Sequence, residues 1–212
     1  YRVFRKKGTE SWTRIADTGS TNYTDRSAAS GTTYAYTVRC IKADGKFASD
    51  YDKNGKSLIR LSTGNVKSIA NAAKGMRLTW TKINGAQGYI IYRAYGSGAY
   101  KAIKTITSGT TLNYTDTSAT VNGGKYSYAV CGYRGSVKGA YTGKSYYCLT
   151  QNRISSVTNS AAGRATVAWS QNAKATGYQV NYKTGNTQKT VTVKSYKTLR
   201  TVLSSLKRRA TY

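Results

Sequence analysis

An internal repeat of about 88 residues is the feature that most constrains how this chain can fold. The segments GMRLTWTKINGAQGYIIYR and GRATVAWSQNAKATGYQVNYK align so that Trp80 and Tyr89 recur 89 residues later as Trp169 and Tyr178. The motif NYTD also occurs twice, and each copy is followed by a glycine turn and the pattern YxYxV. Self-similarity of this kind indicates tandem copies of one structural module.

Within each copy, β-branched and aromatic residues alternate with polar ones over short segments such as 33–40 and 125–132. Alternation with period two predicts strands that bury one face, and glycine-rich clusters between the segments predict turns. No amphipathic helix is evident, so we expect an all-β fold. The expected strands of one copy are 66–70, 76–81, 89–94, 100–105, 111–115, 126–132 and 144–149. Seven short strands in about 90 residues are typical of an immunoglobulin-like sandwich.

The alignment also predicts the boundaries of the copies. Tyr1 aligns with Tyr89 and Tyr178, so residues 1–62 correspond to a copy from its third strand onward. Residues 63–150 form a complete copy. The last copy, 151–212, ends at the start of its sixth strand. We refer to these as the first, central and third repeats.

These residues resemble the fibronectin type III domains that occur in tandem in secreted and surface proteins of Gram-positive bacteria. The resemblance rests on an inward tryptophan in the second strand (Trp80, Trp169), on GAxGY or its variant leading into the third, and on SGTTYxYxV leading into the sixth. It implies tandem β-sandwiches in an extracellular or cell-surface protein. It also implies a tyrosine corner, in which the tyrosine hydroxyl bonds to upstream backbone, at Tyr34, Tyr126 and Tyr212.

The third corner departs from the pattern in one place. The first two copies have Gly31 and Gly123 in the preceding turn, whereas the third has Arg209. Glycine adopts positive φ angles without steric cost and arginine does not. The sequence therefore leaves open whether the same turn forms there.

The inventory of reactive side chains argues against an enzyme. The chain has no histidine and a single glutamate, Glu10, and the only acidic residue after Asp52 is Asp116. General acid and base catalysis usually relies on histidine or on a pair of carboxylates, and neither is available in most of the chain. The same scarcity argues against zinc and calcium sites. We therefore expect no catalytic residue, metal or cofactor.

The formal charge of +27 indicates anionic partners. The C-terminal segment places a tyrosine among cations, as stacking platforms for single-stranded nucleic acid do, although a solvated basic surface is the alternative. Its candidate binding residues are Lys189, Lys194, Tyr196, Lys197, Arg200, Lys207, Arg208 and Arg209. Twenty tyrosines exceed what cores and corners need, so Tyr92, Tyr95, Tyr100 and Tyr147 are further candidates for stacking on sugars or anchoring a protein interface.

The three cysteines receive separate interpretations. Cys131 and Cys148 stand where the first repeat has Arg39 and Arg60, so a disulfide between the sixth and seventh strands is one hypothesis. Two free thiols are the other. By alternation Cys131 faces away from the core, whereas Cys40 falls on the core face and is expected to be a buried free thiol.

The leading interpretation is a non-catalytic binding or spacer module that engages an anionic cell-wall polymer or glycan through basic and tyrosine-rich faces. An adhesin-type module that binds a host protein, such as an immunoglobulin or matrix component, is the second hypothesis. Nucleic acid binding, supported by charge alone, is the third. No apolar run reaches the length of about 18 residues that a membrane helix needs. Incomplete terminal copies would also leave strand edges open to self-association.

The predicted boundaries can be tested by hydrogen exchange. Copies with missing strands expose edges and an open core, so residues 1–62 and 151–212 should exchange faster than 63–150 in the monomer. Exchange read out by NMR or mass spectrometry would check this. Uniform protection in a demonstrated monomer would contradict the boundaries.

Overall fold

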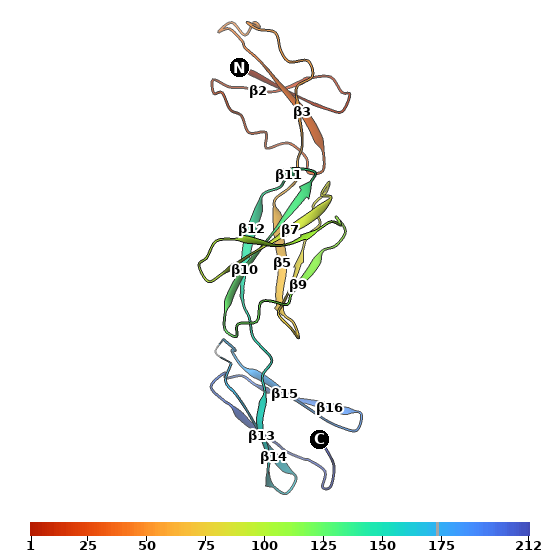
Figure 1. The fold of residues 1–212 in the computed structure, drawn as a ribbon, viewed down its shortest axis with the longest axis vertical. Helices are drawn as coiled ribbons and strands as arrows, with labels where there is room; N and C mark the ends of the chain where they lie inside the picture. Colours follow the sequence, from red (N-terminus) through yellow and green to blue (C-terminus); the bar gives the residue numbers. More distant parts are fainter. Residues whose placement is uncertain (173) are drawn as a thin grey trace. The chain divides into compact units, whose positions relative to one another are not determined.

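The computed structural model describes residues 1–172 and 174–212, and its secondary structure consists of strands (Figure 1). The first repeat forms one antiparallel sheet of order β2-β1-β3-β4. Its strands are β1 (Arg2–Lys7), β2 (Thr13–Asp17), β3 (Thr33–Arg39) and β4 (Lys56–Ile59). The first NYTD motif is not a strand, and the described residues of this repeat contain no second sheet against which it could pair.

The central repeat contains both layers of a sandwich. Its strands follow the order β8-β7-β10-β12-β5-β6-β9, with the short β11 paired to β10. The parallel pair β12–β5 joins the two layers at one edge, where Tyr141 is opposite Gly64. The bounds are β5 (Gly64–Asn71), β6 (Met76–Trp80), β7 (Gly88–Tyr95), β8 (Lys101–Ile106), β9 (Asn113–Asp116), β10 (Lys125–Arg134), β11 (Val137–Lys138) and β12 (Tyr141–Tyr147).

The third repeat has a three-stranded sheet of order β13-β14-β17 and a separate hairpin, β15-β16. Its strands are β13 (Ile154–Ala161), β14 (Arg164–Trp169), β15 (Tyr178–Thr184), β16 (Thr187–Val193) and β17 (Arg200–Leu203). In the central repeat β7 lies between β8 and β10, but among the described residues β15 has only β16 as a neighbour. One backbone edge of β15 is therefore unpaired.

In the central and third repeats, a tryptophan packed on a tyrosine connects the two layers. Trp80 of β6 meets Tyr89 of β7 with ring centroids 5.4 Å apart, and Trp169 meets Tyr178 at 5.3 Å. The Tyr89 hydroxyl accepts a hydrogen bond from the Ile83 N–H and donates one to a loop carbonyl. Both tryptophans are buried.

The tyrosine corners form in all three repeats. In each, the hydroxyl accepts a hydrogen bond from the backbone N–H five residues upstream, over 3.3 Å for Tyr34, 3.4 Å for Tyr126 and 2.6 Å for Tyr212. Tyr34 and Tyr126 are buried, whereas Tyr212 is 40% exposed, so the expectation of a core residue is wrong for Tyr212. Its repeat supplies no facing strands, within the described residues, to cover the ring.

The turn before the third corner takes the same left-handed conformation despite its arginine. Arg209 has φ 59°, compared with 81° for Gly31 and 74° for Gly123. The turn geometry is therefore preserved at the expense of backbone strain.

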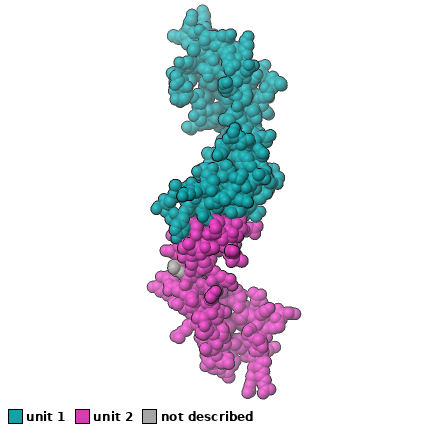
Figure 2. Space-filling view, viewed as in Figure 1, with its two compact units in different colours: residues 1–68, 78–114, 127–144 teal, residues 69–77, 115–126, 145–212 magenta. Residues whose placement is uncertain are grey.

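The chain divides into two compact units (Figure 2). One comprises 1–68, 78–114 and 127–144, and the other comprises 69–77, 115–126 and 145–212. In the first unit the fully buried side chains include Leu78, Tyr89, Ile91, Tyr128 and Val130. The second has a hydrophobic cluster in which Val167, Trp169, Val180 and Leu203 are buried.

The strained turn predicts a stabilising substitution. Arg209→Gly should raise the unfolding free energy of the third repeat by about 1 kcal/mol, because the left-handed region costs L-residues roughly 1–2 kcal/mol and glycine recovers most of it. Urea denaturation followed by amide exchange in β14 and β17 would measure the change. Gly123→Arg is the matched reverse substitution, and stabilisation by both changes would contradict the explanation.

Candidate functional site

Three tyrosines from different parts of the central repeat form a cluster, which we call the tyrosine platform: Tyr92, Tyr100 and Tyr141. The rings of Tyr92 in β7 and Tyr141 in β12 are stacked, with centroids 4.8 Å apart and an interplanar angle of 23°. Tyr100, just before β8, meets Tyr141 edge to face at 6.0 Å. Tyr92 and Tyr100 are half-buried and Tyr141 is 39% exposed, so the cluster presents aromatic surface to solvent.

Cys131 of β10 lies beside the tyrosine platform. By alternation with Tyr128 and Val130 of the core, Cys131 belongs to the outer face of its strand, yet it is only 1% exposed. Partial burial raises the pKa of Tyr92, and the nearby Cys131 and Tyr141 raise it further. The outer face of β10 is therefore covered, which places the platform on a closely packed base.

A glycine makes room for one ring of the platform. A Cβ atom placed on Gly143 of β12 would overlap the hydroxyl oxygen of Tyr100 and come within 2.7 Å of its Cζ. The tip of the Tyr100 ring therefore rests against bare backbone. An alanine at position 143 would displace the Tyr100 ring. The substitution Gly143→Ala therefore alters the platform without removing a tyrosine.

One cation, and no carboxylate of the described residues, lies close to the tyrosine platform. Lys138 of β11 is near enough to the Cys131 thiol to lower its pKa, in opposition to burial. The exposed Lys101 is paired with Arg93, so by alternation it points to the opposite face from Tyr92. Asp116 is the only acidic residue of the central repeat and is 2% exposed. The exposed surface of this repeat can therefore offer aromatic faces and positive charge to a ligand, but no negative charge.

The sequence predicted two members of the platform and missed the third. Tyr92 and Tyr100 are brought together, and Tyr95 is exposed at the end of β7. Tyr147, another candidate, is exposed at the end of β12, where Lys174 lies over its ring at 5.2 Å. Tyr141 could have been predicted as a member of the platform only from the register of β12. The irregular sequence of residues 135–144 does not reveal that register.

The basic segment of the third repeat is exposed throughout. Lys189 lies on β16, Arg200 on β17, and the other candidates lie in the connecting turns: Lys194, Tyr196, Lys197, Lys207, Arg208 and Arg209. The ammonium group of Lys197 lies 5.9 Å from the centre of the Tyr196 ring. The described contacts do not join these residues into a pocket, so they form a distributed positive surface.

Of the two hypotheses for Cys131 and Cys148, the structure has the two free thiols. Both cysteines are buried, and each thiol donates to a different carbonyl, Gly139 at 3.0 Å and Ala119 at 3.1 Å. The alternative of a disulfide is not formed in this structure. Burial raises the pKa of both thiols, so they are poor nucleophiles. Cys40 is exposed, not buried, because it lies just beyond β3 at the start of a long loop.

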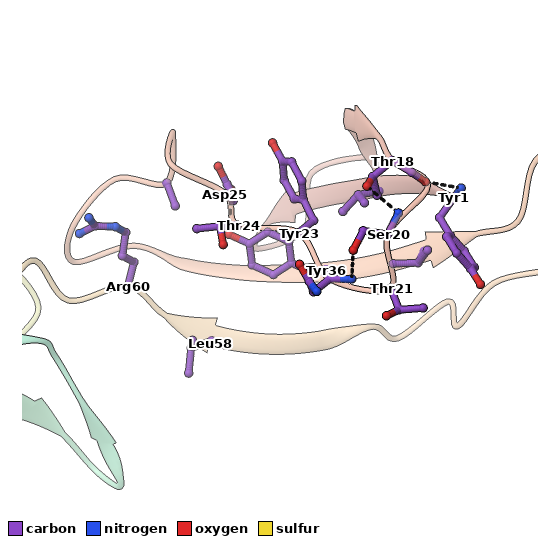
Figure 3. A pocket seen from close by; sticks show the side chains of 14 residues that line it. Tyr1, Thr18, Ser20, Thr21, Tyr23, Thr24, Asp25, Tyr36, Leu58 and Arg60 are labelled. Carbon is purple, nitrogen blue, oxygen red and sulfur yellow. Dashed lines mark hydrogen bonds between the residues drawn. The ribbon is translucent and has the colours of Figure 1, made fainter.

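The first repeat contains an apolar groove of about 650 Å³ (Figure 3). It lies on the face of β1, β3 and β4 that corresponds to the core-facing side of the central repeat. Its lining includes Val3, Tyr36, Val38, Leu58 and Arg60. Val38 is 46% exposed, whereas its counterpart in the central repeat, Val130, is fully buried. Leu58 is 55% exposed, and its counterpart Tyr146 is 45% exposed.

Asp25 anchors the loop at one end of this groove. Its carboxylate accepts hydrogen bonds from Arg5 at 2.7 Å, from the Tyr36 hydroxyl at 2.9 Å, and from the N–H and hydroxyl of Ser27. Burial opposes ionisation of Asp25, but the hydrogen bonds from Ser27, Arg5 and Tyr36 outweigh it and lower the pKa to about 2. Burial and the bond to Asp25 raise the pKa of Tyr36 to about 12.

Within residues 1–172 and 174–212, no group of three or more histidine, cysteine or acidic side chains is placed to hold a metal ion. The same residues include no helix long and apolar enough to cross a bilayer.

Comparison with known proteins gives structural likeness only. No protein-family profile matches the chain, and no curated protein matches it. The chain is similar to the crystal structure of the chicken CNTN1 FN1-FN3 domains, with 16% identity and a TM-score of 0.41, covering 99% of this chain and 82% of that one. It is also similar to a segment of two fibronectin type III domains from chicken tenascin, with 19% identity and a TM-score of 0.33, covering 71% and 85%.

The Asp25 cluster predicts a pH dependence. Because the folded-state pKa of about 2 lies below the usual value of about 3.9, the ionised carboxylate stabilises the first repeat above pH 4, and this contribution is lost as the pH falls toward 2. Amide exchange in β1 and β3 between pH 2 and 6 should show this loss, and Asp25→Asn should remove it. Asp44→Asn, which changes an exposed carboxylate, is the control and should leave the loss intact.

Proposed function

We propose that the chain is a non-catalytic binding and spacer module of a bacterial surface or secreted protein, and that its tyrosine platform binds an anionic glycan or cell-wall polymer. The observation that carries the proposal is the stacked pair Tyr92–Tyr141, with Tyr100 against its edge, in a repeat whose exposed side chains include cations and no carboxylate. Sandwiches of this fold commonly serve as binding or spacer modules, and the fold alone does not specify a ligand.

The chemistry of the platform suits such a ligand. The faces of sugar rings carry C–H groups that pack on the electron-rich faces of aromatic rings. Phosphate or carboxylate groups along the polymer would meet Lys138, which lies near the platform. The basic surface of the third repeat is a separate region that attracts the same class of polymer.

A recurrent contact at the ends of the repeats supports the spacer role. The N–H of Ser62 donates to the Ser30 hydroxyl at 3.0 Å, and at the corresponding place the N–H of Thr150 donates to the Asn122 side chain at 3.3 Å. The Ser30 hydroxyl also lies 3.4 Å from the carbonyl oxygen of Asn84, in the next repeat. The first and central repeats thus each hold their final residue by a hydrogen bond, which limits the freedom of the connection that follows.

A host protein is the second candidate ligand, because exposed tyrosines are frequent anchors of protein interfaces. Nucleic acid is the third and is supported by charge alone. A salt titration distinguishes these classes. Binding to a polyanion by counterion release weakens steeply with salt, whereas a tyrosine-anchored protein interface should persist at roughly 0.5 M salt.

Calorimetric titration with purified teichoic acid or heparin tests the proposal. Tyr141→Ala should weaken binding at least about fivefold, since an aromatic contact contributes roughly 1 kcal/mol. Gly143→Ala should weaken it by displacing Tyr100 while every tyrosine is retained. Tyr146→Ala, which removes an exposed tyrosine of the same strand outside the platform, is the matched control. Equal effects of Tyr141→Ala and Tyr146→Ala would overturn the assignment of the platform.

A pull-down with purified cell walls, compared with host serum or mucus, would separate the first two ligand classes. Retention by walls but not by host proteins is the expected result. Exclusive capture of a host protein would replace the glycan with the adhesin hypothesis.

A further inference from the structure

A row of charged side chains crosses one face of the sheet in the first repeat. Asp17 of β2, Arg2 of β1 and Arg39 of β3 are direct cross-strand partners. Partners of this kind point to the same side of a sheet. The next pair along, Val3 and Val38, lines the apolar groove, so by alternation the row lies on the side of the sheet opposite to the groove.

The charges of this row do not balance. The guanidinium of Arg2 donates to both carboxylate oxygens of Asp17, at 2.9 and 3.0 Å, and Arg14 donates to the same carboxylate at 2.7 Å. Arg39 forms no ion pair among the described residues, although Arg2 is its direct neighbour. Like charges directly opposite each other destabilise a sheet. An anion bound to Arg39 would relieve this repulsion.

Aromatic rings fix the position of the Arg39 guanidinium. Its Cζ lies 3.7 Å from the centre of the Phe47 ring and 5.2 Å from that of Tyr51. Its Nε donates to the Ser49 carbonyl at 3.1 Å, which leaves both Nη nitrogens without a protein acceptor in the described part of the chain. A stacked guanidinium loses little conformational freedom when it binds a ligand.

This face is the counterpart of the tyrosine platform. Arg39 and Phe4 occupy the positions of Cys131 and Tyr92 in the central repeat, and Phe4 contacts Phe47 with ring centroids 6.3 Å apart. The residue that corresponds to Tyr141 is Lys53, so the stacked tyrosine pair is not repeated. In the first repeat, a positioned guanidinium beside aromatic rings takes the place of that pair.

The surroundings of Arg39 favour a ligand group with a single negative charge. The loop that carries Phe47 also carries Asp44, Asp50 and Asp52, which would repel a group of higher charge. A carboxylate has two oxygens in one plane, and they match two parallel N–H groups of a guanidinium. Phe47 is exposed, and the C–H face of a sugar ring can pack against such a ring.

We propose that Arg39 binds the carboxylate of an acidic sugar. The two Nη nitrogens donate to the carboxylate oxygens, and the sugar ring packs beside Phe47. The site is separate from the tyrosine platform and does not depend on what the platform binds. It gives the first repeat a preference for glycans that carry carboxylates over those that are neutral.

NMR titration of the whole chain with a tetrasaccharide of alternating glucuronate and N-acetylglucosamine tests the site. We expect shifts of the Arg39 Nε–H and of the amides of Phe47 and Tyr51. The same tetrasaccharide with its carboxylates reduced to alcohols should bind at least about tenfold more weakly, because the charge-assisted pair of hydrogen bonds is lost. Tyr141→Ala should leave these shifts unchanged, which distinguishes this site from the tyrosine platform.

Two matched substitutions test the role of the guanidinium. Arg39→Lys keeps the charge but removes the planar pair of donors, so it should weaken binding at least about fivefold. Arg26→Lys makes the same change at an exposed arginine of the same repeat and should have little effect. Unchanged amide shifts of β1 and β3 in the Arg39→Lys chain would show that the fold is retained.

Several outcomes would overturn the proposal. These are an absence of shifts at Arg39 in the wild-type chain, equal binding of the reduced tetrasaccharide, and equal effects of the two lysine substitutions. A tetraglutamate peptide that binds Arg39 as tightly as the tetrasaccharide does would also overturn it, because an acidic peptide would then replace the sugar as the ligand.

Discussion

The contact of a tryptophan with a tyrosine across the two layers is the interaction on which the rest of the structure depends. In the central repeat, Trp80 brings the first sheet onto Tyr89, and the Tyr89 hydroxyl then fixes the backbone at Ile83. The pair Trp169–Tyr178 repeats both contacts, with the Asn172 N–H donating to the hydroxyl. In each pair the tyrosine buries its ring against the tryptophan, and its hydroxyl accepts a hydrogen bond from a loop N–H. The spacing in sequence between the tryptophan and the tyrosine therefore determines how the two sheets meet.

Local pattern and internal repetition were sufficient to predict the seven main strands of the central repeat, because alternation follows directly from the pleat of a sheet. The tyrosine corners were expected from the resemblance to fibronectin type III domains, and they form because the residues involved are close in sequence. Burial was harder to predict. Val38 and Val157 have the alternation of core residues but are exposed, because burial depends on a facing sheet that no local pattern reports. Cys131 is the opposite case, an outward residue that is buried.

The tyrosine platform shows a further limit of the sequence. Tyr92 could be identified as outward-facing, but its partner Tyr141 lies about 50 residues away on a strand that is not adjacent to β7 in its sheet. Whether two outward rings meet depends on strand order, on register and on what lies between them. Here Cys131 lies on the intervening strand β10, and Gly143 leaves space for Tyr100. Small residues beneath and beside the rings therefore matter as much as the rings, and composition does not reveal them.

The charge of the chain is distributed unevenly. Six of its seven acidic residues lie in the first repeat, whereas the central repeat has only the buried Asp116 and the third repeat has none. The exposed surfaces of the central and third repeats are therefore positive without local neutralisation, and each attracts polyanions of any kind. Because charge alone does not distinguish one polyanion from another, selectivity of the central repeat for a glycan must come from the stacked tyrosines and not from its lysines and arginines.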